Sequence, residues 1–206
     1  ILHATGSSAL FVTHDQAEAL TLAERVAVIQ RGVIDQVDTP ERVYSVPATP
    51  FVATFVGVAN LVRGEVAGEM ASTPLGPVRL IAGPSAGRAL VVIRPEHVDL
   101  EPVDGVPAYA AAPAGRVGAG SMIPATAAPA PTEHPVAAAP SHARGRIVAR
   151  RFAGAELHYQ VALDAHLHVW VEAGAAARHL TVGDEVRLTM RPVETVGFVT
   201  GGDRVA

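Results

Sequence analysis

His14 is the residue whose type and position best fit chemistry on a phosphate group. It follows the short apolar run 9–13 (ALFVT), which predicts a buried parallel strand, and it precedes the helix formers of 15–24 (DQAEALTLAE). In α/β folds, ligands bind beyond the carboxyl ends of the strands. An imidazole at such a place can donate a hydrogen bond to a phosphate oxygen or orient a water. The competing hypothesis is a histidine that only caps a backbone group.

Arg94 and Glu96 are a second pair of candidates, because Pro95 between them favours an extended segment that places both side chains on one side. One hypothesis is an ion pair at a subunit interface or an effector pocket. The preferred hypothesis is a structural role inside the domain, since an exposed pair of this kind contributes only ~0–1 kcal/mol.

His166 and His168 are two residues apart on an expected strand and would share a face, where His158 could join them across a hairpin. Two ligands without a third make a weak metal site, so the sequence favours ordinary surface histidines and predicts no metal site. Arg150 and Arg151 could bind an anion, although a solvated strand end is the preferred interpretation.

The composition excludes several classes of function. All 16 basic residues are Arg, so there is no Lys, and the net charge is -4. An acidic chain with 4% aromatic residues is unlike a nucleic-acid-binding protein. The absence of Cys excludes disulfides and thiol catalysis. No apolar run approaches the ~20 residues of a membrane helix and no signal peptide opens the chain, so we expect membrane association only through a partner.

The first 59 residues have the patterns of an α/β unit. After the expected strand 9–13, Thr13 and Gln16 fit a capping box that would start the helix, and residues 25–37 predict a hairpin with its turn at Arg31-Gly32. Thr39-Pro40 and Thr49-Pro50 each predict a short helix, with a hydroxyl N-cap followed by Pro at the first position.

Residues 60–206 have the patterns of an all-β module. Short strands separated by Gly and Pro predict a small barrel or sandwich. Residues 104–143 are mostly Ala, Pro and Gly, which predicts a flexible insertion. The expected strands cover 61–66, 78–81, 89–93, 145–153, 156–163, 166–172, 185–190 and 194–199.

Residues 11–57 resemble the end of the ATPase domain of ABC importers for sugars, polyamines, ferric iron or sulfate-like anions. VTHDQAEAL is similar to the switch-histidine segment of that family, and RGVIDQVDTPERVYSVPATPFVATFVG is similar to its closing hairpin and two-helix tail. Asp38 stands where the family usually has Gly, in a turn that Asp also suits. Val92–His97 (VIRPEH) and residues 145–199 resemble the family's C-terminal regulatory module, an oligonucleotide-binding-like (OB-like) TOBE domain.

The resemblance implies an α/β remnant of the ATPase domain at 1–59 and a TOBE domain at 60–206. His14 would be the switch histidine at the γ-phosphate of ATP, while Asp15 and Gln16 would start the helix. It further implies ATP and Mg²⁺ as cofactors of the intact protein, a homodimer, permease subunits, an indirect binding-protein partner, and a place at the cytoplasmic face of the membrane.

The parts that bind the nucleotide are missing. The phosphate loop G-x-x-x-x-G-K-[ST] needs a Lys, which this chain lacks, and no apolar strand ends in Asp-Glu to supply a Mg²⁺ ligand. We therefore expect a fragment that lacks the first ~150 residues of a domain of usual size and is inactive alone. The alternative function is a stand-alone OB-like module that senses a small anion or a protein effector.

Overall fold

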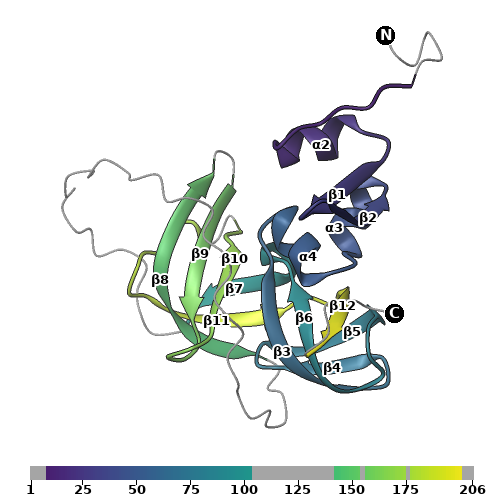
Figure 1. Cartoon of the computed structure of the whole chain (residues 1–206). Coiled ribbons are helices and arrows are strands. Elements are labelled where there is room, and N and C mark those ends of the chain that lie inside the picture. Colours follow the sequence, from purple (N-terminus) through teal and green to yellow (C-terminus); the bar gives the residue numbers. More distant parts are fainter. Residues whose placement is uncertain (1–7, 104–141, 154–155, 175–176, 201–206) are drawn as a thin grey trace.

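The computed structural model describes residues 8–103, 142–153, 156–174 and 177–200. Two β-barrel-like sheets lie side by side, and a segment of helices and one hairpin packs against them (Figure 1). The mostly β architecture confirms the expected barrel module. The predicted insertion falls almost entirely on residues outside the described ones. No helix in the described ranges is long and apolar enough to cross a membrane.

The N-terminal segment follows its local sequence signals closely. The turn of the hairpin has positive φ at both Arg31 (50°) and Gly32 (78°), which is the geometry that matches the twist of two paired strands. Thr39 and Thr49 cap their helices by accepting the backbone N–H of the third residue along. The elements of this segment are α2 (Gln16–Leu22), β1 (Val26–Gln30), β2 (Val33–Asp38), α3 (Pro40–Ser45) and α4 (Pro50–Phe55).

The predicted strand at 9–13 is wrong, because residues 8–15 form neither strand nor helix. A strand needs a neighbour to pair its backbone groups, and the described residues offer none there. The side chains of Leu10, Phe11 and Val12 are exposed instead. The N-cap of α2 is Asp15 rather than Thr13. Among residues 8–59 the only sheet is the antiparallel hairpin, so an α/β unit is not formed by this part alone.

The first barrel is closed, with strand order β12-β5-β4-β3-β6. Its last strand comes from the end of the described chain and runs parallel to β5 and antiparallel to β6. Gly83 has φ +137°, and a Cβ there would meet the Gly197 carbonyl oxygen of β12 at 2.5 Å. The close approach of β12 to this residue therefore requires glycine at position 83. The strands are β3 (Asn60–Ala67), β4 (Met70–Thr73), β5 (Gly76–Ala82), β6 (Ala86–Ile93) and β12 (Glu194–Val199).

The second sheet has the order β10-β9-β8-β11-β7, and its two edge strands β10 and β7 contact each other although they are not neighbours in the ladder. We call this barrel-like sheet the second barrel. The 3₁₀ turn η1 (Pro95–His97) leads from the first barrel into it. One core cluster takes residues from both barrels, while α4 packs through Ala53 against Val92, Val196 and Phe198. The strands are β7 (Val98–Pro102), β8 (Ala143–Ala153), β9 (Glu156–Ala162), β10 (His168–Glu172) and β11 (Glu185–Met190).

Candidate functional site

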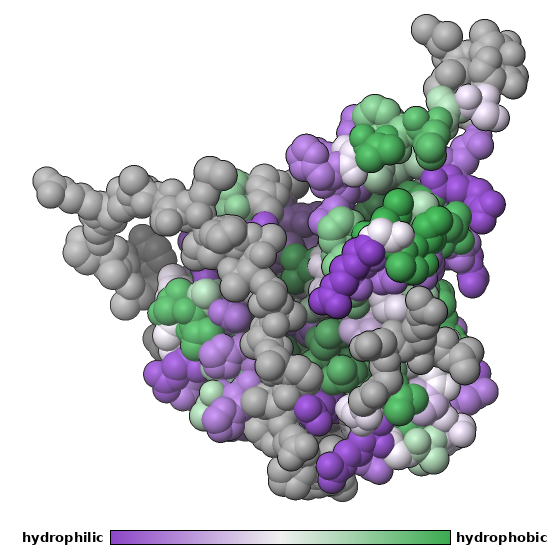
Figure 2. Space-filling model, in the orientation of Figure 1, coloured by the Kyte–Doolittle hydropathy of each residue, from purple (hydrophilic) through white to green (hydrophobic). Residues whose placement is uncertain are grey.

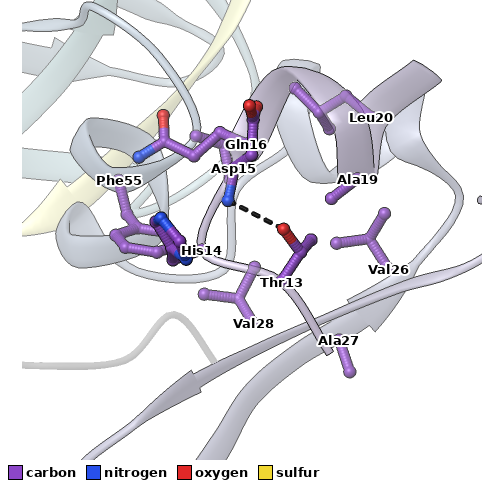
Figure 3. Close-up of a pocket in the computed structure, with 11 residues that line it drawn as sticks. Thr13, His14, Asp15, Gln16, Ala19, Leu20, Val26, Ala27, Val28 and Phe55 are labelled. Carbon is purple, nitrogen blue, oxygen red and sulfur yellow. Dashed lines mark hydrogen bonds between the residues drawn. The ribbon is translucent and has the colours of Figure 1, made fainter. Parts of the chain in front are cut away.

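His14 lies in the irregular segment just before α2, and the local hydrogen bonds fix the backbone around it. The N–H of Asp15 donates to Thr13 Oγ1 (3.0 Å), and the Thr13 hydroxyl donates to Glu18 Oε2 (2.9 Å). Asp15 Oδ1 accepts the N–H of Glu18 (3.1 Å) and so caps the helix. Thr13 and Asp15 are therefore used for structure, whereas the His14 side chain is exposed. Figure 3 shows the imidazole among the residues that line a small pocket.

A small pocket of about 70 Å³ lies beside His14. Its walls come from the segment before α2, from α2 itself, from β1 and from the end of α4 (Figure 3). The lining is mostly apolar, and its polar groups lie at the His14 end. The residues around it are Thr13, His14, Asp15, Gln16, Ala19, Leu20, Val26, Ala27, Val28, Phe55 and Val56.

The arrangement can present one imidazole to a ligand that arrives from solvent. The pocket is far smaller than the ~300–1,000 Å³ that usually encloses a small molecule, so the described residues around His14 do not form a complete nucleotide site there. The same residues contain no cluster of three or more His, Asp or Glu that could hold a metal ion. ATP and Mg²⁺ would need groups from outside this part of the chain.

Apolar side chains gather on the surface over α2 and the β1–β2 hairpin (Figure 2). This exposed apolar surface adjoins the segment that carries His14. A large patch of exposed apolar side chains on one face of a protein is typical of a contact surface. Its exposed members are Leu10, Phe11, Val12, Leu22, Ile29, Val33, Ile34 and Val37.

Arg94 has the structural role that the sequence favoured, but its partner is not Glu96. Its guanidinium is buried and donates to the carbonyls of Ala53 (2.8 Å), Val58 (3.1 Å) and Tyr44 (2.7 Å). It also lies 3.9 Å from the centre of the Tyr44 ring, a cation–π contact. Burial lowers the pKa of Arg94, which remains charged at neutral pH.

Glu96 accepts a hydrogen bond from the Tyr44 hydroxyl (2.7 Å). Burial, and then this bond to a carboxylate, raise the pKa of Tyr44 well above its ordinary value. Tyr44 is thus held between a cation on its ring face and an anion at its hydroxyl. No local pattern pointed to Tyr44, because it lies about fifty positions from both partners.

The histidine cluster considered from sequence does not form. His168 pairs with Ala162 at one end of the β9–β10 ladder, while His158 pairs with Glu172 at the other end. His158 is buried, whereas His166 and His168 are exposed. The separation follows from the antiparallel register, which sequence spacing alone could not provide.

Arg150 and Arg151 are exposed on β8, as the preferred interpretation of a solvated strand expected. Asn60 is a residue whose role the sequence did not reveal. Its side chain donates to the Trp170 carbonyl (2.8 Å) and accepts a hydrogen bond from the Trp170 N–H (2.7 Å). The amide therefore pairs the backbone of β10 in the way that a neighbouring strand would.

Comparison with known proteins gives one family and a set of relatives. The TOBE domain family matches residues 91–198. The sulfate/thiosulfate import ATP-binding protein CysA of Xanthomonas campestris is 49% identical over 115 residues, which are 52% of this chain and 31% of that protein. The spermidine/putrescine import ATP-binding protein PotA of Ruegeria pomeroyi is 42% identical over 107 residues, 48% of this chain and 29% of that protein.

A third relative, the Fe(3+) ions import ATP-binding protein FbpC of Streptomyces avermitilis, is 46% identical over 95 residues. That match covers 46% of this chain and 28% of the relative. In each of these pairs the matched part is roughly a third or less of the relative's length. The family match begins within β6, inside the module expected at 60–206.

Proposed function

Because the chain belongs to the TOBE domain family and its relatives are import ATP-binding proteins, we propose that it is the C-terminal part of the energising subunit of an ABC import system. In this proposal, residues 1–59 complete an ATPase domain and residues 60–206 form the regulatory module. ATP hydrolysis by the whole protein drives uptake through a membrane permease.

The observation that carries the proposal is the exposed apolar surface beside His14. Residues 9–13 have the pattern of a buried strand, yet Leu10 is 94% and Val12 88% exposed. Burying an apolar side chain of this size stabilises a fold by about 1.5–3 kcal/mol, so such a run is a natural strand of a larger sheet. In this proposal, an ATPase domain formed with residues upstream of this chain would supply that sheet and cover the patch.

His14 is proposed as the switch histidine. Thr13 and Asp15 hold the backbone on either side of it, and its own side chain is free to reach a phosphate. A donor placed beside the γ-phosphate can stabilise the charge that spreads over the phosphoryl group and position the attacking water. The phosphate loop, Mg²⁺ ligands and nucleotide pocket would all come from residues upstream.

The proposed partners are a second ATPase subunit and the permease, at the cytoplasmic face of the membrane, with a binding protein acting indirectly. The cargo stays unassigned. The three relatives share 42–49% identity with this chain, yet their names specify sulfate/thiosulfate, spermidine/putrescine and ferric ions. Similarity to these relatives therefore does not assign the cargo.

The test is to measure ATP hydrolysis by the full protein, expressed from the complete reading frame. We expect His14→Ala to lower kcat by about 100-fold or more, the contribution of a positioned proton-transfer or hydrogen-bonding group. The matched control is His166→Ala, which removes an exposed imidazole far along the chain and leaves turnover unchanged. Normal turnover in the His14 variant, or strong ATPase activity in the 206-residue chain alone, would contradict the proposal.

A further inference from the structure

The end of α4 forms one wall of the pocket beside His14. Phe55 and Val56 line this pocket together with His14, although they come from a later element of the chain. Figure 3 shows the Phe55 ring and the His14 imidazole at the same end of the pocket. Val56 is buried, whereas Phe55 is 39% exposed. The Phe55 ring is therefore the group of α4 that the exposed imidazole can contact.

The orientation of the Phe55 ring is set by packing. The ring stacks on that of Phe51, one helical turn earlier, with centroids 5.2 Å apart and planes at 22°. Phe51 in turn packs against the buried cluster that joins α3 and α4 to β1. An aromatic ring stacked in this way has one preferred placement, so the wall of the pocket is a defined surface.

The opposite face of α4 is attached to the β module. Residues two apart on a helix point in nearly opposite directions, so Ala53 lies across the helix from Phe55. Ala53 is fully buried against the first barrel, in a cluster with Val92 and Phe198. One short helix thus contacts the barrel on one side and the His14 pocket on the other.

Arg94 holds the backbone on both sides of Phe55. Its guanidinium donates to the carbonyls of Ala53 (2.8 Å) and Val58 (3.1 Å), which precede and follow Phe55 in the chain. Arg94 is 2% exposed and comes from the turn between β6 and η1, so the β module supplies this cation. The end of α4 cannot shift on the barrel without leaving a buried charge short of partners, which is costly.

His14 is anchored less completely than the wall beside it. The hydrogen bonds of Thr13 and Asp15 fix the backbone around His14, but they do not involve the imidazole. Rotation about the side-chain bonds still moves the ring among its rotamers. Contact with a neighbouring group is therefore what can restrict the imidazole, and the Phe55 ring lines the same pocket.

We propose that Phe55 is a positioning residue for the His14 imidazole, and that the β module sets the place of Phe55 through Arg94 and α4. The imidazole rests against the Phe55 ring, which restricts its rotation before a phosphate arrives. A change in the β module that moves Arg94 shifts this wall and with it His14, which gives the regulatory module a route to ATP hydrolysis. The catalytic consequence rests on the proposed function of His14, whereas the contact between the rings is a property of this chain alone.

The ring contact is tested in the 206-residue chain by NMR of the histidine ring protons, with His14 assigned through His14→Ala. A phenyl ring shifts the signals of nearby protons, so Phe55→Leu is expected to move the His14 signals and leave those of the exposed His166 unchanged. Arg94→Lys is expected to move the His14 signals as well, although Arg94 does not line the pocket. The matched control is Phe152→Leu, which removes an exposed ring of β8 and leaves His14 unchanged.

The catalytic role is tested by ATP hydrolysis in the full protein. Phe55→Leu is expected to lower kcat by about 10- to 100-fold with KM unchanged, because misplacing a catalytic group by about 1 Å can cost about 100-fold and the loss falls on the transition state. Phe55→Tyr keeps the aromatic face and is expected to retain the wild-type kcat. Phe55 is partly exposed at the end of α4, so the fold should tolerate both changes, which circular dichroism checks.

Unmoved His14 signals in the Phe55→Leu variant, or equal movement in the Phe152→Leu variant, would overturn the proposal even if His14→Ala abolishes turnover. A normal kcat in Phe55→Leu beside a low kcat in His14→Ala would overturn the positioning role. Unmoved His14 signals in Arg94→Lys would overturn the link to the β module. Normal turnover in His14→Ala instead overturns the proposed function and the catalytic role with it, while the NMR result still decides the ring contact.

Discussion

At the scale of single residues, Arg94 determines how the N-terminal segment sits on the barrels. It belongs to the turn between β6 and η1, yet its donors reach the carbonyls of Tyr44 in α3, Ala53 in α4 and Val58 in the link to β3. A planar guanidinium can bond all three and stack on the Tyr44 ring at once. Lysine has the same charge but neither the fork nor the flat face.

We therefore predict that Arg94→Lys lowers the free energy of unfolding by about 2–4 kcal/mol, because it leaves buried carbonyls without donors and a buried charge poorly solvated. Urea unfolding followed by Trp170 fluorescence measures this loss. Arg79→Lys is the matched control. Arg79 forms exposed ion pairs with Glu69 and Glu194, so its variant should differ from wild type by less than about 1 kcal/mol. An equal effect of the two substitutions would contradict the role given to Arg94.

At the scale of elements, β10 depends on a side chain at its open edge. One edge of β10 pairs with β9, and on the other edge Asn60 bonds both backbone groups of Trp170. Asn60 is 6% exposed and also begins β3 of the first barrel. A single amide therefore ties the start of one barrel to the edge strand of the other.

Replacing Asn60 tests whether its two hydrogen bonds to Trp170 hold β10 in place. Asn60→Asp keeps the shape and the acceptor but removes the donor to the Trp170 carbonyl and places a carboxylate against it, so we predict a loss of about 2–3 kcal/mol of stability. Hydrogen exchange at the Trp170 amide reports the local effect. Ser72→Ala, at a half-buried position of β4, is the control and should leave that exchange rate unchanged. Unchanged exchange at Trp170 in the Asn60→Asp variant would show that the two bonds do not hold β10.

The sequence predicted the elements whose signals are local. The Arg31-Gly32 turn and the two Thr-Pro helix starts confirm their predictions, because turn and cap preferences act within four residues. The strand at 9–13 was predicted wrongly because a strand forms only when a partner is present. Strands β4 and β7 were missed, since a short run of four or five residues carries little periodicity.

The same difference between local and long-range signals applies to the candidate functional residues. His14 could be chosen from sequence because its neighbours along the chain identify it, although its role stays a prediction. Tyr44 and Phe55 come to lie near Arg94 and His14 only through the tertiary fold. Their sequence neighbourhoods carry no motif for these roles, and the separation of His158 from His168 depends on the register of two strands. Long-range placement of this kind follows from pairing and packing, which local patterns do not specify.

At the scale of the whole molecule, the two barrels share one apolar core. A single cluster of buried residues includes Val62 and Val91 of the first barrel and Ile147, Val169 and Leu188 of the second. Cores that are continuous in this way unfold together, because removing packing on one side exposes the other. The molecule is therefore expected to behave as one cooperative unit across β3–β12.

Leu188→Ala tests this cooperativity. The side chain is fully buried in β11, so we predict a loss of about 2–5 kcal/mol. Amide exchange read by mass spectrometry should then accelerate in peptides of β3 and β6 as well as of β8 and β9. The exposed Val182→Ala is the control and should leave the exchange pattern unchanged. Faster exchange confined to the second barrel in the Leu188 variant would show two independent units.

The closure of the first barrel by β12 has a consequence for biosynthesis. Strands β3–β6 leave the ribosome early, but the strand that joins β5 to β6 is made only after all of β7–β11. Until then the nascent chain presents β5 and β6 with unpaired backbone edges, which are sites where wrong strands can add. The inner strands of the second barrel can pair first, so we expect the first barrel to be the last part of the β module to mature and the part most dependent on protection during translation.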